Sequence, residues 1–184
     1  KGEILGIGGL TDSGMHELGK IMFGIQKPLY GQVTLGDGNK ISSSKQAIQN
    51  KIAYVSKNRD IESLILTASV QENIVLPSLD DLSKGFLISK KDENKLSEKQ
   101  VEELSIKIHD VNQEVKELSG GNKQKVVFGK WLAKESEIFI LDCPTRGIDI
   151  GVKAYMYQLM YRLKKEGKSI IMISEELPEL IGMS

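Results

Sequence analysis

The segment Leu118–Lys125, which reads LSGGNKQK, constrains this 184-residue chain more than any other stretch. Two adjacent glycines directly follow a serine, and a run of helical character follows over residues 122–135. Because glycine has no Cβ, backbone N–H groups at such a position can approach a ligand closely. The start of a helix adds unpaired N–H donors and the positive end of the helix dipole. The segment therefore predicts an anion site, and phosphate is the anion that suits it best.

Short apolar runs alternate with helical patterns along the chain, which predicts an α/β fold with a mainly parallel sheet. Strands are expected at residues 4–8, 32–35, 52–55, 138–141 and 169–173. Helices are expected from about residue 15 and at residues 44–49, 69–75, 152–163 and 176–181. Ligands of parallel sheets bind at the carboxyl ends of the strands, and both the glycine loop 9–14 and Asp142 fall there.

Between these strands, residues 69–125 are expected to be mostly helical. Pro77 is expected to end the first helix of this region, and the lysine-rich stretch 80–95 is expected to be a surface excursion. Ser97 is expected to cap the next helix, because Gln100 stands three residues later, as in a capping box.

The first glycine loop is close to the phosphate-binding pattern G-x-x-x-x-G-K-[ST]. Gly9 and Gly14 match at the right spacing, but Met15 stands where lysine belongs and His16 where serine or threonine belongs. The lysine is needed as a cation on the phosphates, and the hydroxyl as a ligand of Mg²⁺. Methionine carries no charge, and a neutral imidazole is a poor ligand for so hard a cation. Taken alone, the loop could be an ordinary strand-to-helix turn.

Composition limits the classes of function. The chain carries 25 basic and 25 acidic residues, so its neutral charge gives no electrostatic reason to expect a nucleic-acid partner. Its one cysteine, Cys143, cannot form an internal disulfide, which fits a reducing compartment. No apolar run approaches the ~20 residues of a membrane span, so a membrane role is expected only through a partner. Without an initial methionine, residues 1–184 are expected to be one domain of a protein truncated at its N-terminus.

Taken together, these motifs resemble those of the ATP-binding cassette (ABC) ATPases. The string LSGGN resembles the signature motif of the family, and FILDCPT at residues 139–145 resembles the strand and motif that the family writes as LDEPT. The N-x-Q-K continuation resembles the branch that drives importers of ribose, galactose and xylose. PTRGID followed by Gly151 is similar to the C-terminal, second cassette of that branch. The resemblance implies a P-loop NTPase fold of the RecA-like type, with residues 69–125 as a helical subdomain.

The resemblance also implies that the chain's own nucleotide site is degenerate, with no intact catalytic group. Asp142 keeps the position that holds Mg²⁺ weakly, through water. Cys143 replaces the glutamate that polarises the attacking water, and a thiol with a pKa near ~8.5 is no base at neutral pH. Glu175 takes the switch-histidine position, and Lys57 the glutamine-loop position that couples to a permease. The degenerate phosphate loop comprises Gly9, Leu10, Thr11, Asp12, Ser13, Gly14, Met15 and His16.

The groups that act across a cassette dimer are kept. ABC dimers are head-to-tail, so each ATP lies between the phosphate loop of one cassette and the signature of the other. The resemblance implies that this chain completes an ATP site on its partner but is hydrolysis-deficient by itself. The residues expected to face the partner's ATP are Leu118, Ser119, Gly120, Gly121, Asn122 and Gln124, with Gly147 and Asp149 in an interface loop.

The function that the resemblance implies is the nucleotide-binding domain of a sugar importer, peripheral on the cytoplasmic face of the cell membrane. Its cofactors would be ATP and Mg²⁺. Its partners would be a second cassette in the same polypeptide, an integral-membrane permease and, indirectly, a sugar-binding protein. Two alternatives stay open: a regulatory or scaffolding cassette that binds no nucleotide, and a non-transport ABC ATPase. Cys143 can also be read as a small core residue, and His16 as an ordinary helix-start residue.

Overall fold

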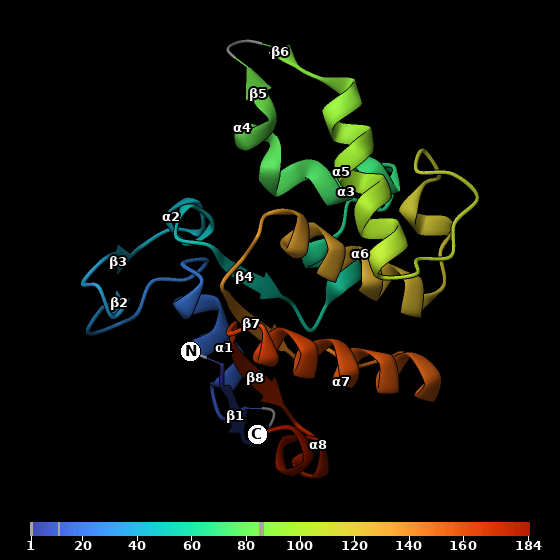
Figure 1. Ribbon diagram of the computed structural model, residues 1–184. Helices are drawn as coiled ribbons and strands as arrows, with labels where there is room; N and C mark the ends of the chain where they lie inside the picture. Colours follow the sequence, from blue (N-terminus) through green and yellow to red (C-terminus); the bar gives the residue numbers. More distant parts are fainter. Residues whose placement is uncertain (1, 11, 85–86) are drawn as a thin grey trace. The chain divides into compact units, whose positions relative to one another are not determined.

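The structure is a computed structural model that describes residues 2–10, 12–84 and 87–184 (Figure 1). The chain divides into two compact units. The first comprises residues 1–57, 136–146 and 150–184, and the second comprises residues 58–135 and 147–149. The expected phosphate loop lies in the first unit, and the LSGGN segment lies in the second.

The first unit is built on a parallel sheet of four strands in the order β1-β8-β7-β4. The strands are β1 (Ile4–Gly8), β4 (Ile52–Val55), β7 (Ile138–Asp142) and β8 (Ser169–Ser174). All four runs are apolar, and those of β4, β7 and β8 are largely buried. The prediction of an α/β fold with a parallel sheet is confirmed, with strand boundaries within one residue of those expected.

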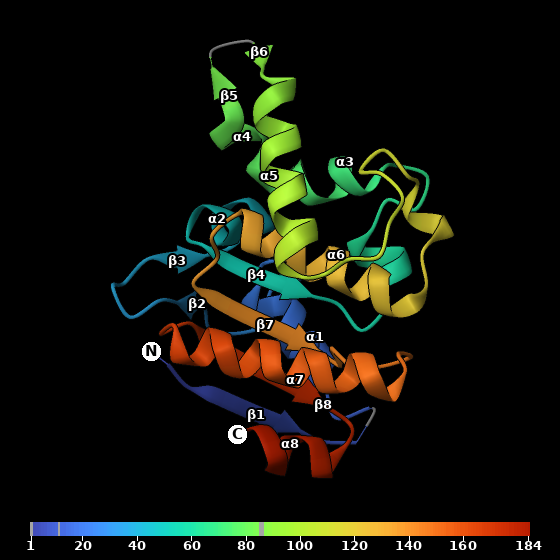
Figure 2. The ribbon, with the colours of Figure 1, turned by 45° about the vertical axis from the view of Figure 1, so that its right-hand side comes forward.

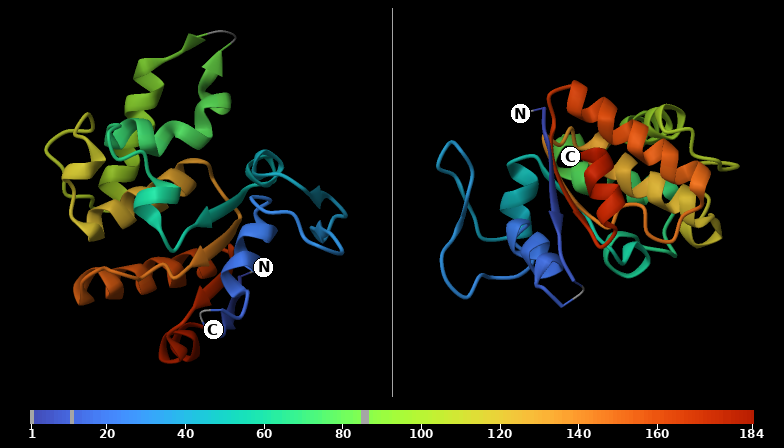
Figure 3. Two further views of the ribbon diagram at one scale, coloured as in Figure 1. Left: turned by 180° about the vertical axis from the view of Figure 1, so that it is seen from behind. Right: turned by 90° about the horizontal axis from the view of Figure 1, so that it is seen from below.

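Helices lie against both faces of this sheet (Figures 2 and 3). On one face, α1 (Met15–Met22) contacts β7 and β8. A Cβ on Gly19 would lie 2.8 Å from Ile173 Cδ1, so the absence of a side chain lets α1 approach the sheet closely. On the other face lie α7 (Ile150–Lys165), which contacts β8, and α8 (Leu177–Met183), which contacts β1 and β8. The core side of α7 is formed by Met156, Leu159, Met160 and Leu163.

A short hairpin and a helix complete the first unit. Strand β2 (Val33–Thr34) pairs antiparallel with β3 (Lys40–Ile41). Helix α2 (Ser44–Gln49) follows, and the Ser43 hydroxyl caps it by accepting from the Gln46 N–H. Both the strand near residues 32–35 and the helix at residues 44–49 were expected from the sequence.

The second unit is mostly helical. Helices α3 (Val70–Val75), α5 (Lys90–Glu103) and α6 (Gly120–Ala133) pack on one another around buried apolar side chains. Leu104 contributes to this core, and a Cβ on Gly129 would lie 3.3 Å from its Cδ1 atom. The elements in chain order are the π-helix η1 (Arg59–Ser63), α3 (Val70–Val75), the 3-10 helix η2 (Leu76–Ser78), α4 (Leu79–Leu82), β5 (Ser83–Lys84), β6 (Leu87–Ile88), α5 (Lys90–Glu103), the 3-10 helix η3 (Val115–Glu117) and α6 (Gly120–Ala133).

One expectation for this unit is wrong, and it concerns where α5 begins. The polar stretch 80–95 holds α4, a β5–β6 hairpin and the start of α5. Ser89, rather than Ser97, caps α5 by accepting from the Asp92 N–H. Ser97 is fully buried inside the helix, where its hydroxyl donates to the Asn94 carbonyl. The lysines and glutamates of the polar run are good helix formers, so α5 begins at Lys90, about two turns before the expected cap at Ser97.

The helix after the signature serine also begins earlier than expected. Ser119 is its N-cap, and α6 starts at Gly120. The paired glycines are therefore the first turn of the helix rather than a loop in front of it, and their N–H groups belong to the positive end of the helix dipole.

Candidate functional site

The phosphate-loop positions form a tight turn between β1 and α1. The Ser13 N–H donates to the Leu10 carbonyl over 2.9 Å, and Gly14 has a left-handed φ of 85° as the N-cap of α1. A Cβ on Gly9 would lie 2.4 Å from Ser13 Oγ, so a side chain there would displace the Ser13 hydroxyl. Met15 stands at the lysine position of the phosphate-binding pattern, but it is only 4% exposed and belongs to the core. Asp12 is exposed, and Thr11 lies outside the described residues.

Four polar side chains that the sequence singled out meet at the carboxyl ends of the strands. His16 Nδ1 lies 2.6 Å from Asp142 Oδ1, and His16 Nε2 lies 3.2 Å from Glu175 Oε1. Lys57 Nζ donates to the same Glu175 oxygen over 2.6 Å and lies 3.2 Å from His16 Nε2. We call these four residues the His16 network. It joins α1 to the ends of β4, β7 and β8.

Tyr54 supports the network from within the sheet and was missed from the sequence. Its hydroxyl donates to Asp142 Oδ2 over 3.2 Å, and its ring stacks on Phe23 at 5.5 Å between centroids. Asp142 is 1% exposed, so its carboxylate needs such partners to offset the cost of burial. A tyrosine inside an otherwise apolar strand is a signal that its hydroxyl has a buried partner.

Electrostatics in the site favour a charged Glu175 and a neutral Cys143. Hydrogen bonds from Lys57 and then His16 lower the pKa of Glu175 to about 2. Burial, and then the negative charge of Asp142, raise the pKa of Cys143 to about 11. At neutral pH, Cys143 is therefore a thiol that cannot accept a proton from an attacking water.

These residues do not fit Mg²⁺ with a nucleotide triphosphate. Mg²⁺ requires oxygen ligands in octahedral geometry, whereas His16 offers an imidazole against the one buried carboxylate of Asp142. Met15 supplies no cation for the phosphates, and Lys57 is already paired with Glu175 over 2.6 Å, so that pair adds no net positive charge. No step of ATP hydrolysis is assigned to these groups.

The signature segment forms a capped helix start in the second unit. Ser119 Oγ accepts from Asn122 N at 3.4 Å and from Asn122 Nδ2 at 3.1 Å. Asn122 Oδ1 in turn accepts from the Lys107 N–H over 2.9 Å. Leu118 and Gln124 are buried, while Ser119 itself is exposed. A hollow of about 490 Å³ lies beside them, with Lys107, His109, Gln113, Glu117, Ser119 and Asn122 among the residues that line it.

Arg59 holds the signature next to the expected interface loop, and it was also missed from the sequence. Its guanidinium donates to the Gly147 carbonyl over 3.2 Å. A Cβ on Gly120 would lie 3.0 Å from that guanidinium and 3.2 Å from the Gly147 oxygen. Gly147 has a left-handed φ of 66°, and Asp149 is exposed in the same unit. The signature and the interface loop, which the sequence predicts to face a partner cassette, thus belong to one compact unit.

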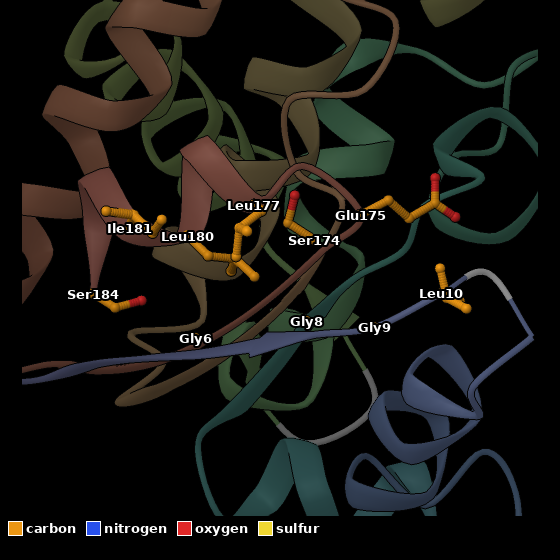
Figure 4. Close-up of a pocket in the computed structure, with 10 residues that line it drawn as sticks. All are labelled: Gly6, Gly8, Gly9, Leu10, Ser174, Glu175, Leu177, Leu180, Ile181 and Ser184. Carbon is orange, nitrogen blue, oxygen red and sulfur yellow. The ribbon is translucent and has the colours of Figure 1, made fainter.

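A separate hollow of about 670 Å³ runs between β1 and α8 (Figure 4). The glycines of β1 form one side of it, and Leu177, Leu180 and Ile181 of α8 form the other. Figure 4 shows the Glu175 carboxylate directed away from these α8 side chains. Of the His16 network, Glu175 lines this hollow, whereas His16, Lys57 and Asp142 do not.

The parallel sheet, its strand–glycine loop–helix unit and the serine-capped glycine helix together define a nucleotide-binding cassette. The chain belongs to the ABC transporter family, whose sequence pattern it matches over residues 1–146. Within the described residues, no helix is both long and apolar enough to span a bilayer.

Three relatives are similar along the whole chain. A ribose import ATP-binding protein of Bacillus cereus is 43% identical over 185 residues, which cover 100% of this chain and 37% of that protein. A xylose import ATP-binding protein of Thermoanaerobacter pseudethanolicus is 47% identical over 186 residues, with the same coverage of 100% and 37%. A putative ribose/galactose/methyl galactoside import ATP-binding protein of Rhizobium etli is 45% identical over 184 residues, covering 100% and 35%. The chain thus spans little more than a third of the length of these relatives.

Solved structures agree on the fold. The dimeric structure of a bacterial ABC transporter cassette has a TM-score of 0.81 at 24% identity, covering 98% of this chain and 78% of that one. A nucleotide-free cassette from an ABC transporter has a TM-score of 0.75 at 20% identity, covering 100% and 74%. The expected P-loop NTPase fold of the cassette type is confirmed.

Proposed function

We propose that this chain is the C-terminal, second ATP-binding cassette of an importer for a simple sugar of the ribose, galactose or xylose kind. The family is that of ABC transporters, and the similar proteins are import ATP-binding proteins for such sugars. Those proteins are nearly three times as long as this chain, which leaves room in one polypeptide for another cassette. The Asn122–Lys125 continuation supports the sugar-importer branch, and the run PTRGID at residues 144–149, followed by Gly151, supports the second position.

We further propose that the two halves of the chain's chemistry serve different sites. The observation that carries this is the contact of 2.6 Å between His16 Nδ1 and Asp142 Oδ1, which takes up the carboxylate that would hold Mg²⁺. With Cys143 protonated and Met15 in the core, the chain's own site is degenerate and the isolated chain is hydrolysis-deficient. The exposed Ser119 at the start of α6 completes the site for Mg²⁺ and ATP on the partner cassette.

In this proposal the chain is peripheral on the cytoplasmic face of the membrane. Closure of the cassette pair on ATP would drive an integral-membrane permease, with the loop that contains Lys57 as one coupling contact. A sugar-binding protein would deliver the sugar on the far side of the membrane. The neutral charge of the chain gives no support to a nucleic-acid partner.

The first test uses the full polypeptide that contains this chain and measures ATP hydrolysis. Gly120→Ala should abolish hydrolysis, because the methyl group presses on the Gly147 carbonyl and on Arg59 beside the signature. Gly182→Ala is the matched control, since a Cβ there meets no atom within 4 Å and hydrolysis should be unchanged. Hydrolysis that survives Gly120→Ala would favour a regulatory or scaffolding cassette instead.

The second test measures Mg-ATP binding to the 184-residue chain by calorimetry. We expect negligible binding, which Met15→Lys should partly restore by placing a cation at the phosphate loop. Tight binding by the unchanged chain would contradict the degenerate site.

Salt-dependent binding to nucleic acid would point to a non-transport ABC ATPase.

A further inference from the structure

Three side chains of different donor type lie together at the edge of the sheet. His16, Asp142 and Cys143 each offer one ligand atom, and these atoms all lie within 4.8 Å of one another. Asp142 is 1% and Cys143 8% exposed, and His16 is partly buried. His16 comes from the first turn of α1, and the other two from the end of β7, so rigid elements of one unit position all three.

We propose that His16, Asp142 and Cys143 bind a divalent transition-metal ion of the zinc class. An imidazole nitrogen, a carboxylate oxygen and a thiolate sulfur are the donors that Zn²⁺ takes in proteins, whereas Mg²⁺ selects oxygen. The same substitutions that remove a hydroxyl and a carboxylate from the family pattern therefore supply a softer donor set. Metal binding here does not depend on the proposed transport function.

The distances require only small movements. Zinc bonds of about 2.0–2.3 Å in tetrahedral geometry separate neighbouring donor atoms by roughly 3.3–3.7 Å. The His16–Asp142 contact of 2.6 Å would open, and the longest separation in the trio, at most 4.8 Å, would close. Each change is on the order of 1 Å, within reach of side-chain rotations. Three protein ligands leave the fourth position for water or an anion.

The charges also match. Cys143 would bind as a thiolate and release its proton to solvent, as metal-bound thiols do. One thiolate and the Asp142 carboxylate carry two negative charges, which equal the charge of the metal ion. Glu175 and Lys57 already form a contact of 2.6 Å with each other, so they add no net charge beside it.

Two neighbours are placed to orient the ligands. Glu175 Oε1 lies 3.2 Å from His16 Nε2, where it would accept from the Nε2–H and leave the Nδ1 lone pair for the metal. The Tyr54 hydroxyl donates to Asp142 Oδ2 and so leaves Oδ1 to face the metal. Such partners behind the ligands are a usual part of zinc sites.

The test titrates Co²⁺, a spectroscopic substitute for Zn²⁺, into the reduced 184-residue chain. We expect a thiolate-to-cobalt charge-transfer absorption at one equivalent, which Zn²⁺ removes and Mg²⁺ does not. Cys143→Ser should eliminate that absorption. Glu175→Gln should weaken Co²⁺ binding about tenfold or more, because it changes the partner behind a ligand. His16→Ala, which removes a ligand, should weaken it at least as much. His109→Ala is the matched control, because His109 is the only other histidine and is exposed in the second unit.

Absence of the absorption in folded chain would overturn the proposal, as would Co²⁺ binding that survives His16→Ala and is lost in His109→Ala. The rival is a metal-free His16 network held by hydrogen bonds alone, and it predicts no absorption. Fluorescence of the single tryptophan, Trp131, and circular dichroism report whether each variant is folded. If Cys143→Ser does not fold, Glu175→Gln still tests the site, since it keeps all three ligands. None of these measurements involves ATP, so their failure is separable from failure of the transport proposal.

Discussion

Cys143 should react with a disulfide reagent at least about tenfold more slowly in the folded chain than in the unfolded chain at pH 8. Burial and Asp142 raise its pKa from 9.0 to about 11, which lowers the thiolate fraction at pH 8 about 100-fold. A more basic thiolate is also more nucleophilic, and a Brønsted slope of about 0.4–0.5 over this rise in pKa increases the rate constant of the thiolate by a factor of about 8. The net effect is about tenfold, and the 8% exposure of the residue slows the reaction further.

The assay follows release of the aromatic thiol from Ellman's reagent, in buffer and in concentrated urea. Because the chain has one cysteine, the whole signal belongs to Cys143. Glu175→Gln should accelerate the folded-state reaction, since the charge of Glu175 raises the pKa of Cys143, and Lys57→Gln should slow it, since the charge of Lys57 lowers that pKa. Equal rates in folded and unfolded chain would refute the reasoning and reopen Cys143 as a possible base.

Three further predictions concern stability. Burial lowers the pKa of Lys130 from 10.5 to about 8, so Lys130→Met should stabilise the fold by up to about 3 kcal/mol at pH 7. Between pH 8 and 10.5, Lys130 is protonated in the unfolded wild type but not in the folded wild type, so the free energy of unfolding of the wild type rises with pH in this window. The stability advantage of Lys130→Met should shrink accordingly, and urea unfolding followed by Trp131 fluorescence at several pH values measures it. Ser69→Ala removes the capping box with Glu72 and should cost about 1 kcal/mol in the same unfolding assay. The pKa of Glu175 is lowered from 4.5 to about 2, so wild type should lose stability as pH falls through that window, and Glu175→Gln should lose less in acid melting curves.

Most of the sheet could be predicted from the sequence, because each strand is an apolar run bounded by glycine or polar residues. The strand 52–55 and the helix 44–49 were placed to the residue. Helix starts were harder to predict, because Ser89 and Ser97 are both suitable N-cap residues, followed three positions later by Asp92 and Gln100. Only packing decides between them, and Ser97 is fully buried.

The motifs placed the site residues at the right edge of the sheet but could not reveal their contacts. His16 and Asp142 are separated by 126 residues, and their contact depends on strand order, which local patterns do not specify. Tyr54 and Arg59 were missed for the same reason. Tyr54 signals only that its hydroxyl has a buried partner, and Arg59 gives no local signal. Each gains its role from a partner 88 residues away.

The His16 network has a consequence for how this chain tolerates substitution. His16, Lys57, Asp142 and Glu175 satisfy one another, so replacing any one leaves a charged neighbour with a lost contact. A serine at position 16, for example, would remove a partner from both carboxylates at once. The effects of substitutions within the network should therefore be non-additive, because a second replacement no longer loses the contact that the first has already removed. Four positions that lie far apart in the sequence thus behave as one unit under mutation.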